Sequence, residues 1–290
     1  MFAAISRSES AVPNSKAGSP GPPRSVGAVR IAFLGVGTRT ALADLHQQGC
    51  MKARLPRSYD GDPLTAILIN TAGGLTGGDD VETAVEWGAE AQACFSTQAA
   101  ERIYRSSGGA ALIRNRLTAG AGASAEWLPQ ETILFDAGRF RRETAVDLDP
   151  ASRFLAVESV VLGRKAMGET IRTGMIADRW SVWVGGRLVW LDAFRLEDDL
   201  AAQIARPAVL AGAGAYATVI AQADEPDAVL AAIREGVGAD GGASRRGPLV
   251  VGRVTAPDGD TLRLRLAALI PALRRVVTGQ PARLPRVFGI

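Results

Sequence analysis

Short apolar segments with period-two alternation run along the chain from Val26 onward, and turns rich in Gly, Pro and Asp separate them at close spacing. Such alternation is typical of strands with one buried face. The pattern therefore predicts a mainly all-β protein. The expected strands are residues 29–34, 66–70, 81–87, 91–97, 110–117, 124–128, 144–148, 153–162, 215–221 and 249–254.

The sequence RWSVWVGGRLVWLD (179–192) predicts a β-hairpin, because a glycine pair separates two β-rich arms by two residues. Counting outward from the turn places Val184 opposite Arg187 and Val182 opposite Val189. Both faces of this ribbon carry apolar side chains. We therefore expect it to be covered on both sides.

Few segments have helical periodicity. Residues 225–235 place apolar side chains at helical spacing behind acidic residues and an early proline. Residues 261–277 have a similar pattern, which Pro271 is expected to interrupt. Both helices should lie at the periphery of a β core.

One predicted strand, RFLAVESVVL (153–162), is apolar on both faces except for Glu158. A buried carboxylate is costly unless it is paired or bound to a metal. The nearby Arg164 and Lys165 offer an ordinary pairing explanation. A second acidic residue, Glu169, follows just beyond this strand.

Composition indicates a globular protein, with 47% apolar and 22% charged residues among 290. Basic residues number 33 against 30 acidic ones, so charge gives no support to nucleic-acid binding. No apolar run reaches 18 residues, and the N-terminus lacks the apolar centre of a secretory signal. We therefore expect a cytoplasmic protein with no membrane association.

The N-terminal segment is dense in Ser, Pro, Gly and charge, a composition that cannot bury enough apolar surface to offset the entropy of ordering. Residues 1–25 are predicted to form a disordered tail. Residues 26–290 are predicted to form a single β-rich domain.

Cysteine and histidine usage argues against a tight metal site. Cys50 and Cys94 are far apart in the sequence and lie in no CxxC spacing, and His46 is the one histidine. Zinc, nickel and copper sites usually draw on several such ligands. We expect no disulfide framework and no tightly bound cofactor, and His46 should be a polar loop or surface residue.

The glycine-rich segment NTAGGLTGGDD (70–80) is the first candidate for chemistry, since such loops can surround phosphate. No Lys follows the glycines, and acidic residues come next, so a tight turn with close backbone approach is favoured. Farther along, Glu131 and Asp136 flank the apolar sequence ILF. These carboxylates should lie at the margin of the core.

Four segments together carry a resemblance to a known family: INTAGGLTGGD (69–79), STQAAERIYRS (96–106), EWLPQETILFD (126–136) and LGRKAMGE (162–169). In this order and spacing they resemble the signature blocks of the urease accessory protein family UreD, also called UreH. The resemblance runs from about Val26 to the C-terminal PRVF. Two departures are Asp80, where a basic residue is common, and Ala137-Gly138, in the reverse of the usual order.

The resemblance implies an elongated, right-handed β-helix-like stack of many short strands with about two peripheral helices. It also implies a non-catalytic protein that acts with UreF, the GTPase UreG and apo-urease in nickel delivery. The chain itself carries no GTPase motif. On this basis, transient Ni²⁺ would pass through the interior along carboxylates of the signature blocks and the Glu158 strand. The candidate residues are Asp79, Glu131, Asp136, Glu158 and Glu169.

Two other functions stay open at this point. A pure scaffold would hold UreF and urease together and open urease without carrying nickel. A hydrolase with paired carboxylates would need two acids in one cleft with displaced pKa values. The sequence contains no substrate-binding constellation that supports the hydrolase.

Overall fold

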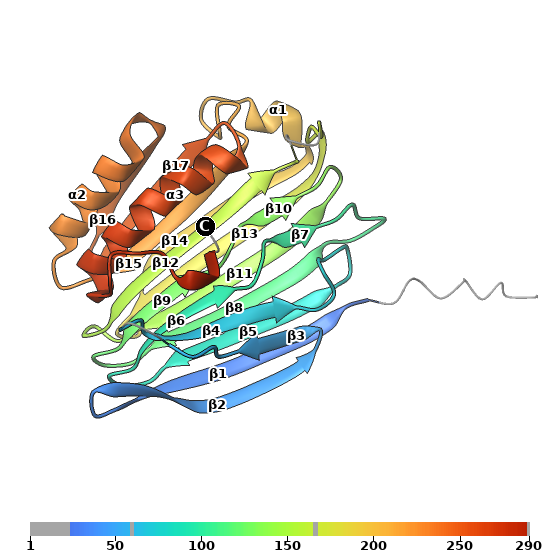
Figure 1. Cartoon of the computed structure of the whole chain (residues 1–290). Helices are drawn as coiled ribbons and strands as arrows, with labels where there is room; N and C mark the ends of the chain where they lie inside the picture. The colour runs from blue at the N-terminus through green and yellow to red at the C-terminus, as the bar shows by residue number, and fades with distance from the viewer. Residues whose placement is uncertain (1–23, 59–60, 165–167, 289–290) are drawn as a thin grey trace, which may run out of the picture.

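A computed structural model of the chain describes residues 24–58, 61–164 and 168–288. Most of the predicted N-terminal tail, residues 1–23, lies outside the described residues. Within them, the chain forms two stacked β-sheets, with two of its helices side by side against one sheet (Figure 1). Sheet A has the order β14-β13-β11-β8-β5-β1-β2. Its strands are β1 (Val26–Val36), β2 (Arg39–Gly49), β5 (Asp80–Trp87), β8 (Ala111–Ala119), β11 (Arg139–Leu148), β13 (Thr173–Val184) and β14 (Arg187–Asp199).

The second sheet, sheet B, has the order β16-β17-β15-β12-β9-β6-β4-β3, with two short strands, β7 and β10, beside it. Its strands are β3 (Met51–Arg54), β4 (Leu64–Asn70), β6 (Gln92–Thr97), β7 (Glu101–Ile103), β9 (Ser124–Leu128), β10 (Thr132–Leu134), β12 (Arg153–Leu162), β15 (Ala215–Gln222), β16 (Gly241–Arg246) and β17 (Leu249–Ala256). The helices are α1 (Leu200–Ile204), α2 (Pro226–Val237) and α3 (Gly259–Leu273).

The chain alternates between the two sheets from β4 to β13, and neighbouring strands within each sheet in this region are parallel. Each passage from sheet A to sheet B is a four-residue turn, at 88–91, 120–123 and 149–152. Each return to sheet A uses a longer segment. The result is a β-solenoid of about four turns, which confirms the expected β-helix-like stack.

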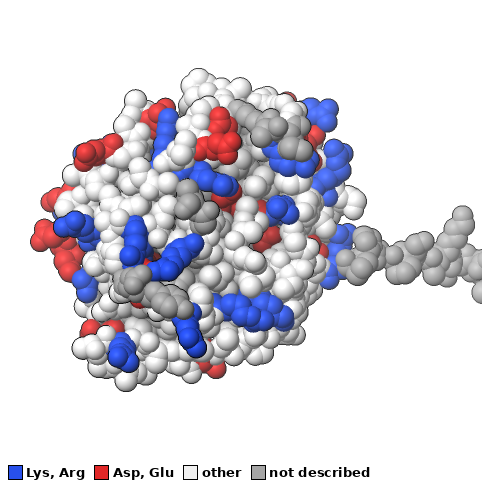
Figure 2. Space-filling model, in the orientation of Figure 1, with Lys and Arg blue, Asp and Glu red and all other residues white. Residues whose placement is uncertain are grey.

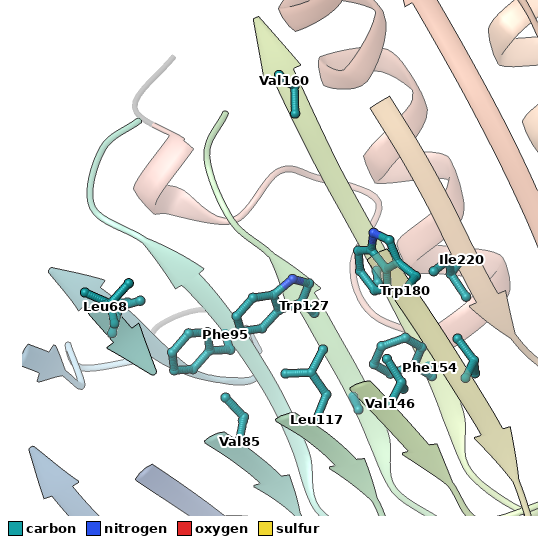
Figure 3. Packing of buried hydrophobic residues seen from close by; sticks show 14 of the residues in the cluster. Leu68, Val85, Phe95, Leu117, Trp127, Val146, Phe154, Val160, Trp180 and Ile220 are labelled. Atoms are coloured by element: carbon teal, nitrogen blue, oxygen red, sulfur yellow. The ribbon is translucent and has the colours of Figure 1, made fainter. Parts of the chain in front are cut away.

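Two apolar layers hold this stack together. The first lies between the sheets, where alternating residues of both sheets meet, and Phe95 and Trp127 stack at 5.1 Å (Figure 3). The second lies between sheet B and the helices α2 and α3. Strand β12 contributes to both layers, so nearly all of its residues are buried. This explains why its sequence is apolar on both faces.

The predicted strands and both predicted helices are confirmed, with two corrections. Pro271 does not interrupt the second helix: α3 continues through it and changes to a π-helical turn at Arg274–Thr278. The predicted β13–β14 hairpin has the expected Val184–Arg187 pair, but a bulge shifts the register so that Val182 pairs with Trp190.

The expectation that this hairpin is covered on both sides is wrong. Leu188 and Leu191 of β14 are 53% and 50% exposed. The reason is that β14 is the edge strand of sheet A, whereas α2 and α3 pack on sheet B. The prediction for His46 is confirmed, since it lies exposed on β2 at the opposite edge of sheet A.

Candidate functional site

The four sequence blocks occupy equivalent places in successive turns of the solenoid, where the chain returns from sheet B to sheet A. Backbone hydrogen bonds join them: Leu75 N–H donates to Arg102 O (2.7 Å), Phe135 N–H to Ile103 O (3.0 Å) and Gly163 N–H to Leu134 O (2.8 Å). They therefore form one continuous side of the molecule. We call this side the signature wall, made of residues 70–79, 98–106, 129–138, 163–164 and 168–173.

Glycine in the first block is required by this stacking, as the sequence predicted. Gly74 has φ of 147°, and a Cβ there would lie 2.3 Å from the Tyr104 ring and 2.8 Å from Arg102 O. At Gly77 a Cβ would lie 2.3 Å from Gly108 O. Only glycine lets the first turn approach the second this closely.

Aromatic side chains fix the outer surface of the wall. Tyr104 meets Phe135 edge-on, with ring centroids 5.0 Å apart, and its hydroxyl donates to Gly73 O at 3.1 Å. The guanidinium of Arg164 lies 4.1 Å from the Phe135 centroid. All four blocks thus contact one another through this cluster as well as through the backbone.

Two of the five candidate carboxylates, Asp136 and Glu169, come together on the wall. Asp136 accepts from the backbone N–H groups of Arg172 (2.9 Å) and Thr173 (3.1 Å) and from the Arg172 guanidinium (2.9 Å). Burial opposes ionisation of Asp136, but these donors outweigh it and lower its pKa to about 2. Hydrogen bonds from Arg164 lower the pKa of Glu169, with a smaller contribution from the Asp136 backbone.

The structure separates Asp79 and Glu131 from that pair. Asp79 is buried and accepts from the backbone N–H groups of Ser25 (2.7 Å) and Thr76 (2.8 Å), so it fixes the turn into β5. Glu131 lies on the helix side, where Arg263 of α3 donates to it at 2.5 Å. Among the described residues, no three His, Cys, Asp or Glu side chains gather closely enough to hold a metal ion.

The fifth candidate, Glu158, lies between the two sheets and is 2% exposed. Trp127 Nε1 donates to its Oε1 at 2.6 Å. Its Oε2 lies 3.0 Å from Arg142 Nη1, although no donor meets it in hydrogen-bonding geometry. Arg142 also binds Asp178 through two contacts, of 3.1 and 2.5 Å. Glu158, Arg142 and Asp178 therefore form a buried triad of two carboxylates and one guanidinium.

The sequence-based pairing of Glu158 with Arg164 is wrong. Arg164 lies on the signature wall and binds Glu169, whereas Lys165 lies outside the described residues. The reason is geometric: Glu158 faces sheet A across the interior, and Arg142 of β11 is the cation that faces back.

Glu158 and Arg142 of the triad border a cavity of about 60 Å³ that has room for one or two water molecules. Oxygen- and nitrogen-bearing side chains form much of its lining. These are Thr83, Thr97, Glu101, Asn115, Gln130, Thr132, Arg142 and Glu158. A second cavity, of about 100 Å³, is lined by wall residues and shares Leu68, Thr97 and Glu101 with the first. Glu101 therefore stands where the wall meets the interior.

Burial raises the pKa of both cavity carboxylates to about 7. Glu101 accepts two hydrogen bonds of 3.1 Å from Asn70 Nδ2, which oppose this effect in part. For Glu158 the attraction of Arg142 opposes burial, and the repulsion from Asp178 adds to it. Near neutral pH, each carboxyl group is therefore close to the point at which it releases its proton.

Replacing Glu158 by glutamine should change how stability depends on pH. Between pH 4.5 and about 7 the unfolded chain releases this proton while the folded protein keeps it, so stability present at pH 4.5 is lost as pH rises. At about 1.4 kcal/mol for each pKa unit, the loss is roughly 3 kcal/mol. Urea unfolding at pH 5 and pH 8 should show it in the unmodified protein and not in the variant. Equal pH dependence would contradict the shifted pKa.

Several polar residues of the interior escaped the sequence analysis. Arg142 follows the alternation of Phe140, Thr144 and Val146 on the buried face of β11, but the predicted strand began only at residue 144. Extending that alternation backward would have found it. Another buried pair, Glu126 and Arg274, had no local signal, because its members lie 148 positions apart.

A profile described as UreD urease accessory protein matches residues 25–288. The chain belongs to the UreD family. It is 44% identical over 270 residues to the urease accessory protein UreD of Rhizobium etli, covering 93% of this chain and 97% of that protein. It is 45% identical over 268 residues to the UreD of Agrobacterium fabrum, covering 92% of each chain. Membership gives this UreD-family chain an accessory role in the urease system.

The two departures from the family pattern lie at definite places in this UreD-family structure. Asp80 accepts from Arg114 Nη2 at 2.6 Å on β5. Ala137 adopts φ of 63°, a left-handed conformation that costs a non-glycine residue about 1–2 kcal/mol. No helix among the described residues is long and apolar enough to cross a membrane.

Proposed function

We propose that this chain binds apo-urease together with UreF and UreG in the cytoplasm and passes Ni²⁺ to urease through its interior. The main support is the pair of cavity carboxylates, Glu101 and Glu158, inside a core that is otherwise mostly apolar. A buried carboxylate without a full set of partners is expensive to keep. Binding of a passing cation would explain why a carboxylate is present at such a position.

The chemistry of the cavity suits a cargo that must leave again. Carboxylate, hydroxyl and amide oxygens bind Ni²⁺ less tightly than thiolate or several imidazoles would. Arg142 beside Glu158 reduces the net negative charge, which weakens the attraction for a divalent cation further. Protonation near pH 7 gives each carboxyl group a further way to release the ion.

The remaining candidates have other partners already. Asp136, Glu169 and Glu131 bind arginines, and Asp79 binds backbone N–H groups. On this proposal they shape the wall around the path, and nickel would reach their oxygens only by displacing these donors. Because these carboxylates already have partners, a scaffold that opens urease without carrying the ion is the second candidate function.

The test of the accessory role uses cells that express urease, UreF and UreG but lack a UreD-family protein. Adding this chain should restore urease activity, and the tagged chain should co-purify with UreF and the urease subunits. Restored activity without GTP hydrolysis by the purified chain would agree with a non-catalytic role. Failure to restore activity, or to bind any of these proteins, would contradict the proposal.

A further inference from the structure

The solvent-exposed surface of the signature wall is basic. In its described segments, every charged side chain that is exposed belongs to an arginine: Arg102, Arg105, Arg164 or Arg172. We call these four the arginine row. The acidic residues of the same segments are buried or half-buried, and two of them, Asp136 and Glu169, bind arginines of the row. Figure 2 shows basic side chains along the right-hand rim, which corresponds to the loops beside β7 and β10 in Figure 1.

Two arginines of the row, Arg164 and Arg172, are held in position by neighbouring carboxylates. Asp136, with 8% of its side chain exposed, binds the Arg172 guanidinium, which is itself 74% exposed. Arg164 is fixed between Glu169 and the face of Phe135. Side chains ordered in this way lose little further entropy when a partner binds. Arg105 lies 3.9 Å from the shared Asp136 carboxylate and keeps 71% of its side chain exposed.

We infer that the arginine row is a docking surface for an acidic protein surface, whose carboxylates bind the outward-facing guanidinium groups. This inference rests on the proposed function. Guanidinium groups pair with carboxylates through two parallel hydrogen bonds, and a neighbouring aromatic residue such as Tyr104 adds contact area. A partner docked here would cover the Glu101 cavity where it borders the wall.

The charges beyond the end of the arginine row favour a protein partner over a nucleic acid. Past Arg172, two exposed carboxylates lie at the end of β14: Asp198, which is 85% exposed and 3.6 Å from Arg139, and Asp199. A phosphate backbone extending in that direction would be repelled. The whole chain carries a net charge of only +3, which gives no long-range attraction for nucleic acid.

The test reverses two exposed charges of the arginine row, one of which, on Arg105, lies 3.9 Å from Asp136. The double variant Arg102→Glu/Arg105→Glu is compared with Arg141→Glu/Arg179→Glu, which reverses two exposed arginines on the outer face of sheet A. The probes are purified UreF, purified apo-urease and a 20-nucleotide single-stranded RNA. Binding is measured by titration at two salt concentrations, and thermal unfolding confirms that both variants are folded.

The inference expects the unmodified chain to bind UreF or apo-urease in a salt-dependent manner. It expects the wall variant to lose about tenfold or more of that affinity and the sheet A variant to keep it. Unchanged affinity of the wall variant for both proteins would overturn the inference while leaving the proposed function intact. Loss of RNA binding alone would also overturn it. Failure of the unmodified chain to bind either protein would instead contradict the proposed function.

Discussion

Replacing Arg142 by methionine should lower the free energy of unfolding by about 3–5 kcal/mol, the usual cost of removing one partner from a buried ion pair. The guanidinium neutralises both Glu158 and Asp178, and all three side chains are buried. Methionine keeps much of the apolar volume but leaves two carboxyl groups facing each other. Urea unfolding at pH 7.5 measures the loss.

Arg116→Met is the matched control, because Arg116 pairs with Glu82 on the exposed face of sheet A. An exposed pair contributes at most about 1 kcal/mol. If both substitutions cost the same, the interior triad is not a buried ion cluster of the kind the structure describes. A native-like unfolding free energy for Arg142→Met would contradict it most strongly.

Much of the fold could be predicted from local pattern. Period-two alternation located most of the strands but not β2, β3, β7, β10 and β16, and the glycine pair at 185–186 located the hairpin turn. The bulge at Val182 could not be predicted, because it arises from pairing between two strands and not from either strand alone. Exposure of Leu188 depends on which strand forms the sheet edge, which is a property of the whole topology.

The candidate site was predicted in part. The apolar pattern around Glu158 correctly indicated a buried carboxylate. Its partner could not be read from nearby residues, because Arg142 approaches from the opposite sheet. The four blocks were recognised as sequence, but their stacking into one wall follows from the solenoid repeat. The close stacking of successive turns also explains why glycine occupies positions 74 and 77, where a Cβ would meet atoms of the next turn.

The largest functional effect is expected from the double variant Glu101→Gln/Glu158→Gln. Glutamine keeps the shape of each side chain and removes the charge that would attract Ni²⁺. The variant should still assemble with UreF, UreG and apo-urease, since neither residue is exposed. Glu86→Gln/Glu143→Gln, on the exposed face of sheet A, is the matched control.

The most direct measurement is the number of nickel ions per urease active site. It is determined by elemental analysis of urease purified after activation by each assembled complex. The conduit account predicts a fall of about tenfold or more with the interior variant, the factor that about 1.4 kcal/mol of lost cation stabilisation produces. It predicts no change with the control. Full nickel loading by a properly assembled interior variant would contradict passage along Glu101 and Glu158 and would favour the scaffold.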